Sequence, residues 1–249
     1  MISSTRNPTV QSVRRLRKPV FRDREGTYLA EGTEPLRSAL DAGVRVRRVF
    51  VLQGAATRRE ALLKEATAAG AKVNAVARQV MAYLTDTASA PELLSVVELR
   101  ATTLETLTRG SGLLLAGVAD PRVVGAAMAS IEVIDGDFVV VTRGTADVFG
   151  EKAVRAARGA HARLRVVRDV AASEAVSFFR ERGERLIGLV EGGRPPWQID
   201  LTGPFVLALG KQIAGACDEE VSVPGPGELP LTAQVGAILA EAVRQRGTG

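Results

Sequence analysis

The sequence has very few of the residues that build disulfides and metal sites. Its 249 residues include one cysteine, Cys217, and one histidine, His161. A single cysteine excludes an internal disulfide and is compatible with a reducing, cytoplasmic compartment. Neither residue has a second soft ligand at metal spacing, so we expect no metal site. A serine or cysteine nucleophile would need His161 as its base, and we expect that residue to pack on a helix near the surface instead.

Long hydrophobic runs are also missing. No stretch approaches the ~18 to 20 uncharged residues of a membrane helix, so we expect a soluble protein with no membrane partner. Residues 1–18 are basic but lack a following apolar segment, unlike a secretory signal. No Walker-type or dinucleotide-binding glycine pattern occurs. We therefore expect a cytoplasmic protein without a nucleotide fingerprint.

Positive charge is concentrated near the N-terminus. The chain has a net charge of +5, and seven basic side chains precede Glu25 against one acid, Asp23. Clustered arginines suit phosphate groups, and they gain affinity for nucleic acid by releasing counterions. A solvated basic helix face fits the same pattern. If the partner is a polyanion, the residues expected to bind it are Arg14, Arg15, Arg17, Lys18 and Arg22.

The first hundred residues alternate between helical and strand patterns. Helices are expected at residues 10–18, after Gly32, at 57–70 and after 76, and strands at 28–30, 46–52, 72–76 and 93–99. This alternation predicts a compact α/β layer sandwich. Residues 101–112 are polar and poor in large apolar side chains, so they are predicted to be a linker between domains 1–100 and 113–249.

Residues 113–249 repeat this plan with more apolar strands. Strands are expected at 113–118, 137–142, 163–167, 185–190, 205–209 and 221–223, and helices near 123–131, at 150–160, after 171 and after 230. Continuous apolar strands separated by helices predict a mostly parallel sheet covered on both faces. The fold class is therefore α/β.

The stretch 204–245 is the one around which we expect the chain to be organised. Its strand ends at Leu209, Gly210 turns the chain, and the Pro/Gly-rich loop 224–227 leads into a closing helix. A glycine at the carboxyl edge of a parallel sheet is a common place for a ligand. An ordinary strand–turn–helix packing unit gives the same pattern, and the pattern alone favours that simpler interpretation.

Several segments together resemble the SpoU-type RNA ribose methyltransferases of the SPOUT superfamily. The similarity covers ISSTRNPTVQSVRRLR (2–17), YLAEGTEPLRSALDAG (28–43), residues 120–142, TADVFGEKAVRAARGAHARLRV (145–166), FVLALG (205–210) and residues 223–239. The first two segments are similar to the family's substrate-recognition domain. The others stand at its motifs, and residues 145–166 match best.

The resemblance implies the architecture and chemistry of that family. It implies a ribosomal-protein-like, RNA-binding α/β domain over 1–100 with a basic N-terminal arm, and a SPOUT domain with a trefoil knot over 113–249. It also implies S-adenosylmethionine as cofactor, a homodimer formed through the last helix, and methyl transfer to a ribose 2'-hydroxyl of rRNA or tRNA. The implied cofactor-binding residues are Leu209, Gly210, Val223 and Leu231.

The chain departs from the family at catalytic positions. Val123 and Ala129 replace an asparagine and an arginine of the first motif, while Lys211 and Gln212 replace an asparagine and a glutamate of the second. Neither valine nor alanine can position or deprotonate a ribose hydroxyl. A cation at position 211 would also disfavour a nearby sulfonium. The side chains that could take over are Thr232, Arg155 and Lys152.

Three hypotheses follow. The protein is an active S-adenosylmethionine-dependent RNA 2'-O-methyltransferase with a divergent site, or a catalytically inactive pseudo-methyltransferase that acts as an RNA-binding dimer. The third hypothesis is a structural or regulatory protein that binds another protein through the knotted domain. RNA binding is expected under the first two hypotheses and not under the third.

Overall fold

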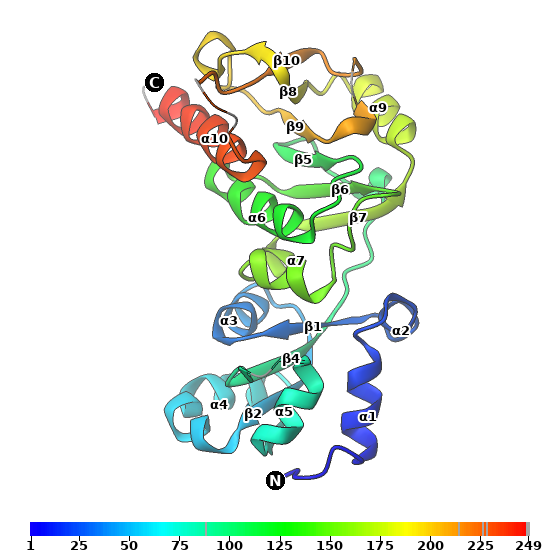
Figure 1. The fold of residues 1–249 in the computed structure, drawn as a ribbon, viewed down its shortest axis with the longest axis vertical. Coiled ribbons are helices and arrows are strands. Elements are labelled where there is room, and N and C mark those ends of the chain that lie inside the picture. Colours follow the sequence, from blue (N-terminus) through cyan, green and yellow to red (C-terminus); the bar gives the residue numbers. More distant parts are fainter. Residues whose placement is uncertain (88, 214, 226, 228, 248–249) are drawn as a thin grey trace. The chain divides into compact units, whose positions relative to one another are not determined.

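The computed structural model describes residues 1–247 apart from 88, 214, 226 and 228. It divides into two compact units, each with its own sheet (Figure 1). Unit 1 comprises Met1–Arg100 and Phe149–Arg163, and unit 2 comprises Ala101–Val148 and Leu164–Gly249. None of the helices formed by the described residues combines the length and apolar character that a membrane span requires.

Unit 1 is built on a four-stranded mixed sheet in the order β1-β4-β2-β3. Its strands are β1 (Thr27–Glu31), β2 (Val46–Leu52), β3 (Lys72–Val76) and β4 (Leu93–Glu98). β4 pairs antiparallel with β1 and β2, whereas β2 and β3 are parallel. Its helices are α1 (Pro8–Arg15), α2 (Pro19–Glu25), α3 (Thr33–Asp41), α4 (Glu60–Ala68), α5 (Arg78–Thr85), α7 (Glu151–Ala156) and α8 (Ala160–Arg163).

Prolines divide the N-terminal region into two helices where the sequence predicted one. Asn7 caps α1 by accepting a hydrogen bond from the Thr9 amide at 2.9 Å, and Pro8 occupies the first turn. Pro19 begins α2, and Gly26 ends it with a φ of 61°. The helix predicted at residues 10–18 is thus present as α1, which begins two residues earlier and ends three residues earlier, whereas α2 was not predicted.

Helices α7 and α8 belong to unit 1 although they lie far along the sequence. Phe149 and His161 pack on Tyr28, with ring centroids 5.2 and 5.7 Å from the tyrosine ring. The backbone breaks between the two helices at Gly159, which has a φ of 93° and lies against Ser38. His161 is only 5% exposed, so the expectation that it lies near the surface was wrong.

Unit 2 is built on a six-stranded sheet in the order β10-β8-β9-β5-β6-β7. Its strands are β5 (Gly112–Leu115), β6 (Phe138–Thr142), β7 (Arg165–Val170), β8 (Leu186–Arg194), β9 (Val206–Leu209) and β10 (Glu219–Val221). Every pairing in this sheet is parallel among the described residues, which confirms the predicted parallel architecture. β10 lies two residues before its predicted position.

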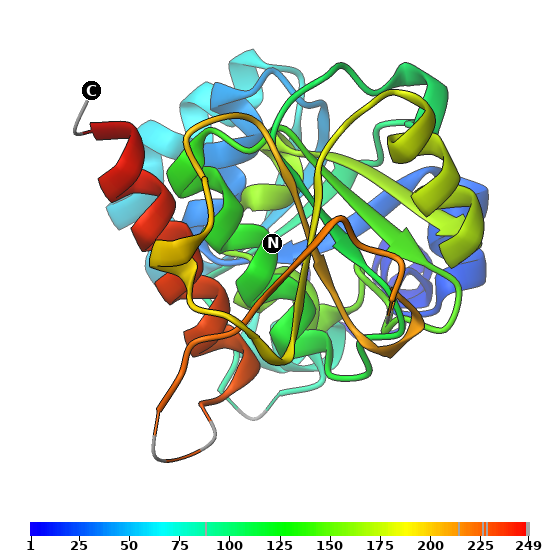
Figure 2. The same cartoon turned by 90° about the horizontal axis from the view of Figure 1, so that it is seen from above.

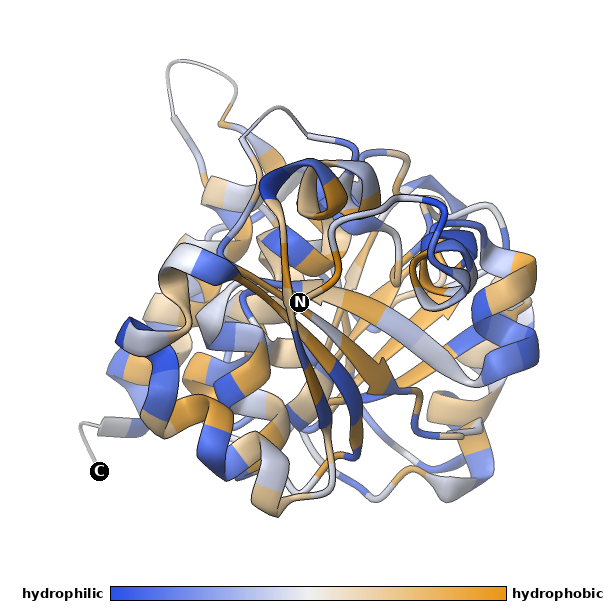
Figure 3. Cartoon of the chain, turned by 90° about the horizontal axis from the view of Figure 1, so that it is seen from below, coloured by the Kyte–Doolittle hydropathy of each residue, from blue (hydrophilic) through white to orange (hydrophobic). Residues whose placement is uncertain are grey.

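Helices cover both faces of this sheet. α6 (Pro121–Ile131) and α10 (Leu231–Gly247) pack side by side on one face, and α9 (Ala172–Glu181) lies on the other (Figure 2). The rings of Phe138 and Phe179 stack 5.6 Å apart between β6 and α9. Many strand residues are hydrophobic (orange in Figure 3), and every residue of β5, β6 and β9 is buried, as expected for strands covered on both faces.

The compact units do not follow the predicted domain boundaries at two segments. Leu104 and Leu107, in the predicted linker, are buried in the core of unit 2. Residues 149–163, predicted to lie in the second domain, pack in unit 1. The function of each domain and the trefoil knot stay predictions.

Arg246 fastens the end of α10 to the rest of unit 2. Its guanidinium donates hydrogen bonds to the carbonyls of Ile134 (2.8 Å), Gly203 (3.0 Å) and Leu201 (3.2 Å). It also donates to Oγ of Ser111 at 3.2 Å. One cation thus satisfies acceptors from three separate connections of the chain.

We expect Arg246→Met to destabilise unit 2 by about 2–4 kcal/mol, because acceptors matched to a charged donor lose their partner. Trp197, the only tryptophan, lies in this unit, so its fluorescence during urea unfolding measures the change. Arg244→Met is the control: Arg244 is exposed on the same helix and paired with Glu241 at 2.7 Å, and its loss should cost less than about 1 kcal/mol. Equal effects of both substitutions would contradict the prediction.

Candidate functional site

The carboxyl ends of three neighbouring strands meet at one edge of the sheet in unit 2. β5 lies between β6 and β9, and Leu115 pairs in register with Val141 and Leu209. Free backbone groups gather where adjacent parallel strands end, and ligands commonly bind there. This edge contains the position that the sequence predicted for a ligand.

The side chain of Gln212 connects the loops at this edge through hydrogen bonds. Its Oε1 accepts a hydrogen bond from Oγ1 of Thr142 at 2.7 Å, and its Nε2 donates to the carbonyl of Arg143 at 3.1 Å. Its backbone amide donates to the carbonyl of Ala116 at 3.3 Å. A glutamate carboxylate could not donate to the Arg143 carbonyl, so these loops are matched to an amide.

Thr145 joins the loops that follow β5 and β6. Its hydroxyl donates to the carbonyl of Leu115 and accepts from the amide of Gly117, both at 2.9 Å. The amide of Ala146 donates to the carbonyl of Val118 at 2.8 Å. Sequence reasoning missed Thr145, because a threonine in a loop carries no spacing that would mark it.

Gly210 lets the loop after β9 lie directly against the end of β5. Its φ is 109°, and a Cβ atom there would overlap the carbonyl of Ala116. Leu209, just before it, is fully buried, and its carbonyl accepts a hydrogen bond from the Ala116 amide at 2.8 Å. The predicted turn therefore has a steric cause that requires glycine.

The other two predicted cofactor residues flank a loop that the structure describes only in part. Val223 follows β10, Leu231 is the first residue of α10, and both are half-buried. Residues 226 and 228, between them, lie outside the described residues. Lys211 is exposed, so its ammonium has access to solvent rather than being buried in the edge.

The predicted catalytic residues lie on two helices. Thr232 is half-buried in the first turn of α10, whereas Lys152 and Arg155 are exposed on α7. Arg155 donates to the carboxylates of Glu31 at 2.8 Å and Glu151 at 2.7 Å. Burial raises the pKa of Glu31, and the guanidinium of Arg155 opposes that rise. Arg155 thus has acidic partners within unit 1.

Val123 and Ala129 are half-buried on α6. Asp120 caps this helix by accepting a hydrogen bond from the Arg122 amide at 2.8 Å, and its carboxylate pairs with the Arg122 guanidinium at 3.2 Å. The charged groups at the start of α6 are therefore Asp120 and Arg122. The side chains of Val123 and Ala129 cannot transfer a proton.

Cys217 lies in the loop after β9 with its thiol in the protonated form. Burial, together with the charges of Asp218 and Glu220, raises its pKa to about 11. A thiol with this pKa is a poor nucleophile near neutral pH. Within the described part of the chain, no three His, Cys, Asp or Glu side chains gather in a way that could hold a metal ion.

Four of the five predicted RNA-binding residues line one depression of about 350 Å³ at the end of α1. They are Arg14, Arg15, Arg17 and Lys18. Arg14 and Arg17 pair with Asp86 at 3.5 and 3.3 Å. The fifth residue, Arg22, is buried and donates to the carbonyls of Leu16 and Arg17 at 3.1 and 3.0 Å. Its guanidinium stabilises the turn between α1 and α2, so this side chain is not among those that face solvent and could bind RNA.

Two family models match the chain. The MRM3-like substrate binding domain matches residues 7–95, and the SpoU rRNA Methylase family matches residues 111–229. The first match falls in unit 1, and the second covers every strand of the unit 2 sheet together with α7 and α8.

Curated relatives are described as RNA methyltransferases. An uncharacterized tRNA/rRNA methyltransferase of Mycobacterium ulcerans is 34% identical over 145 residues, which is 54% of this chain and 47% of that protein. The chain thus spans about half the length of such relatives. The 23S rRNA (guanosine(2553)-2'-O)-methyltransferase RlmP of Bacillus subtilis is 26% identical over 86% of this chain and 83% of its own length.

Solved structures share the fold along nearly the whole chain. The SpoU methyltransferase AviRb from Streptomyces viridochromogenes, in complex with the cofactor AdoMet, has a TM-score of 0.82 and 26% identity, covering 98% of this chain and 100% of that one. An rRNA methyltransferase from Sinorhizobium meliloti has a TM-score of 0.84 and 22% identity, covering 98% of this chain and 96% of that one.

We expect Gly210→Ala to destabilise unit 2 by about 1–3 kcal/mol, because an added Cβ meets the Ala116 carbonyl in a left-handed backbone conformation. Urea unfolding followed by Trp197 fluorescence measures the change. Gly203→Ala is the matched control, since Gly203 has no positive φ and nothing lies within 4 Å of the position of its Cβ. If both variants unfold at the wild-type urea concentration, the steric explanation of the Gly210 turn fails.

Proposed function

Because residues 111–229 belong to the SpoU rRNA methylase family, we propose that the protein is an S-adenosylmethionine-dependent RNA 2'-O-methyltransferase. The observation that carries the proposal is the similarity to AviRb over 98% of the chain and to RlmP over 86% of it. The RNA that we propose as substrate is rRNA or tRNA, and we place the protein in the cytoplasm, where these RNAs are found.

The carboxyl edge of the unit 2 sheet suits the cofactor. We propose that S-adenosylmethionine binds against Leu209, Gly210, Val223 and Leu231, three of which are half-buried rather than closed off by the core. Gly210 leaves backbone groups free of a side chain at this edge. The exposure of Lys211 lets its charge stay in solvent, away from a sulfonium. When bound, the cofactor supplies an electrophilic methyl group.

The chain itself has to position the ribose hydroxyl, whose proton passes to solvent water as the methyl group is transferred. Misplacing a reacting group by about 1 Å can cost ~10²-fold in rate. We propose Thr232 as the side chain that orients the hydroxyl, because it is a half-buried residue with a hydroxyl group at the start of α10. Lys152 and Arg155 are exposed cations suited to an RNA phosphate, although Arg155 must then give up a contact with Glu31 or Glu151.

We propose a homodimer that forms through α10. Val243 is exposed on this helix, and Val133 and Trp197 are exposed on short turns that pack against it. Large apolar side chains that stay exposed on one helix and on the turns packed against it favour a protein interface at that helix.

Calorimetric titration with S-adenosylmethionine and S-adenosylhomocysteine, followed by transfer of a tritiated methyl group to total rRNA and tRNA, tests the enzymatic proposal. We expect micromolar binding and label that is retained in alkali-stable dinucleotides, which form at 2'-O-methylated sites. Thr232→Val should lower the transfer rate by about 10²-fold without weakening cofactor binding. Ser130→Ala, a loss of one hydroxyl on α6, is the control and should retain the wild-type rate.

Failure of both ligands to bind at millimolar concentration would overturn the enzymatic proposal. If RNA still bound under those conditions, the protein would be an RNA-binding pseudo-methyltransferase.

Sedimentation velocity tests the homodimer. We expect the wild type to sediment as a dimer and Val243→Glu to sediment as a monomer, because an interface carboxylate would lose its hydration without gaining a partner. Val20→Glu, an exposed valine of α2, is the control and should stay dimeric. A monomeric wild type, or a dimeric Val243→Glu, contradicts the proposed interface.

A further inference from the structure

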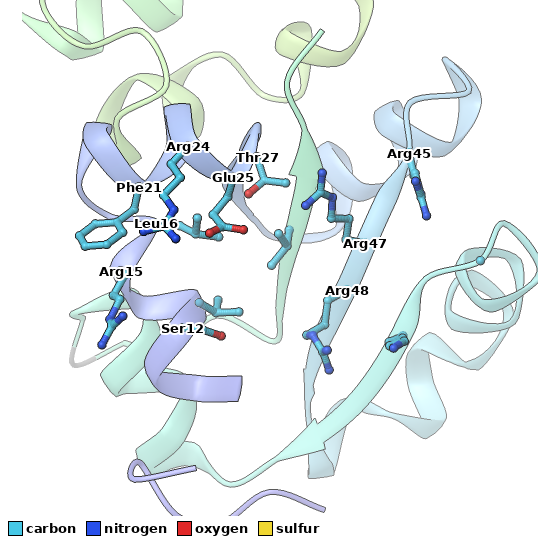
Figure 4. A pocket seen from close by; sticks show the side chains of 14 residues that line it. Ser12, Arg15, Leu16, Phe21, Arg24, Glu25, Thr27, Arg45, Arg47 and Arg48 are labelled. Carbon is cyan, nitrogen blue, oxygen red and sulfur yellow. The ribbon is translucent and has the colours of Figure 1, made fainter. Parts of the chain in front are cut away.

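Unit 1 contains a cleft of about 490 Å³ across one end of its sheet. We call it the basic cleft, because six cationic side chains line it: Arg15, Arg24, Arg45, Arg47, Arg48 and Lys72. Figure 4 shows Arg15 and Arg24 on the helices that form one wall, and Arg45, Arg47 and Arg48 on β2 and the residue before it, which form the other wall. The buried side chain of Val96 lies between them on β4.

A β-bulge explains why β2 presents two neighbouring arginines to the cleft. β2 pairs Val46 with Val97 of β4, and Arg48 with Val96, so Arg47 is an extra residue in the ladder. In a regular strand, Val46 and Arg48 would point to the same face. The bulge shifts that alternation, which leaves Val46 in the core and lets both arginines line the cleft.

The positive charge of the basic cleft is only partly neutralised by the protein. Glu25 is the only acid among its lining residues. Glu98, at the edge, pairs with Arg47 at 2.8 Å and Arg45 at 3.6 Å. Arg15, Arg24 and Lys72 have no carboxylate at ion-pair distance among the described residues. A concave surface with uncompensated cations on its helices and on β3 raises the local concentration of anions.

The cations are spread across the basic cleft rather than directed at one point. They come from α1, α2, the start of β2 and the start of β3, and Arg48 pairs in register with Lys72. Arg15 also lines the depression formed with Arg14, Arg17 and Lys18, so the two hollows share a side chain. A chain of several phosphates fits this arrangement better than a single small anion does.

We propose that the basic cleft binds the sugar-phosphate backbone of a short single-stranded segment of the RNA substrate. This inference rests on the proposed function for the identity of the anion as RNA, and it adds contacts that the sequence did not predict: Arg24, Arg45, Arg47, Arg48 and Lys72. Phe21 also lines the cleft and offers an aromatic surface, as in other grooves that track single strands.

A triple variant with Arg15→Ala, Arg24→Ala and Lys72→Ala tests the inference. The probe is a fluorescein-labelled, mixed-sequence single-stranded RNA of 20 nucleotides, titrated by anisotropy between 50 and 200 mM KCl. Loss of three phosphate contacts should lower the affinity about tenfold or more and reduce the slope of log affinity against log salt by about 2. The control, Arg58→Ala, Lys64→Ala and Arg78→Ala, removes the same charge from exposed positions of unit 1 that do not line the cleft, and it should bind as the wild type does.

Three outcomes of the binding titrations would overturn the inference. One is no binding of the probe by the wild type, another is an equal loss in both triple variants, and the third is tighter binding of inorganic phosphate or ATP than of the probe. Cofactor titration and methyl transfer are measured on the same variants. Full methyl transfer by the cleft variant would contradict the proposed role of the basic cleft but not the enzymatic proposal. RNA binding that depends on the cleft, without cofactor binding, would contradict the enzymatic proposal but not the role of the cleft.

Discussion

The parallel pairing of the strands in unit 2 is the constraint on which its candidate site depends. Parallel strands need long return connections and bring their carboxyl ends to the same edge of the sheet. Loops that meet there have to satisfy one another's polar groups, and Gln212 and Thr145 do so across the ends of β5, β6 and β9. Gln212 therefore does more than replace the glutamate found in the family. Its amide both accepts a hydrogen bond from Thr142 and donates one to the carbonyl of Arg143, which a carboxylate could not do.

The arginines of unit 1 serve different purposes that their spacing in the sequence does not distinguish. Arg22 is buried and holds backbone carbonyls, while Arg14 and Arg17 are paired with Asp86. Arg15 and Arg24 have no such partner among the described residues and face the basic cleft. The electrostatic character of this unit therefore follows from which cations the fold leaves uncompensated, and much less from their total number.

The strands of unit 2 could be predicted because buried parallel strands are continuous apolar runs, and the turn at Gly210 because glycine marks a backbone that other residues cannot adopt. The break at Gly159 was harder to predict, because the apolar period continues across it, and α2, which begins at Pro19, was not predicted. The basic cleft could not be predicted from the sequence, because it depends on a β-bulge at Arg47 and on pairing between distant strands. The placement of α7 and α8 depends on contacts of Phe149 and His161 with Tyr28, more than a hundred residues away.

That placement has a consequence for how the protein is made. The chain leaves unit 2 after Val148, completes unit 1 with α7 and α8, and returns to unit 2 at Leu164. During synthesis, residues 1–100 emerge from the ribosome before the two helices that cover Tyr28 exist. Unit 1 can reach its final packing only after residue 163 has emerged, by which time β5 and β6 are already available to pair. The two units therefore mature in overlapping periods rather than one after the other, as separate domains commonly do.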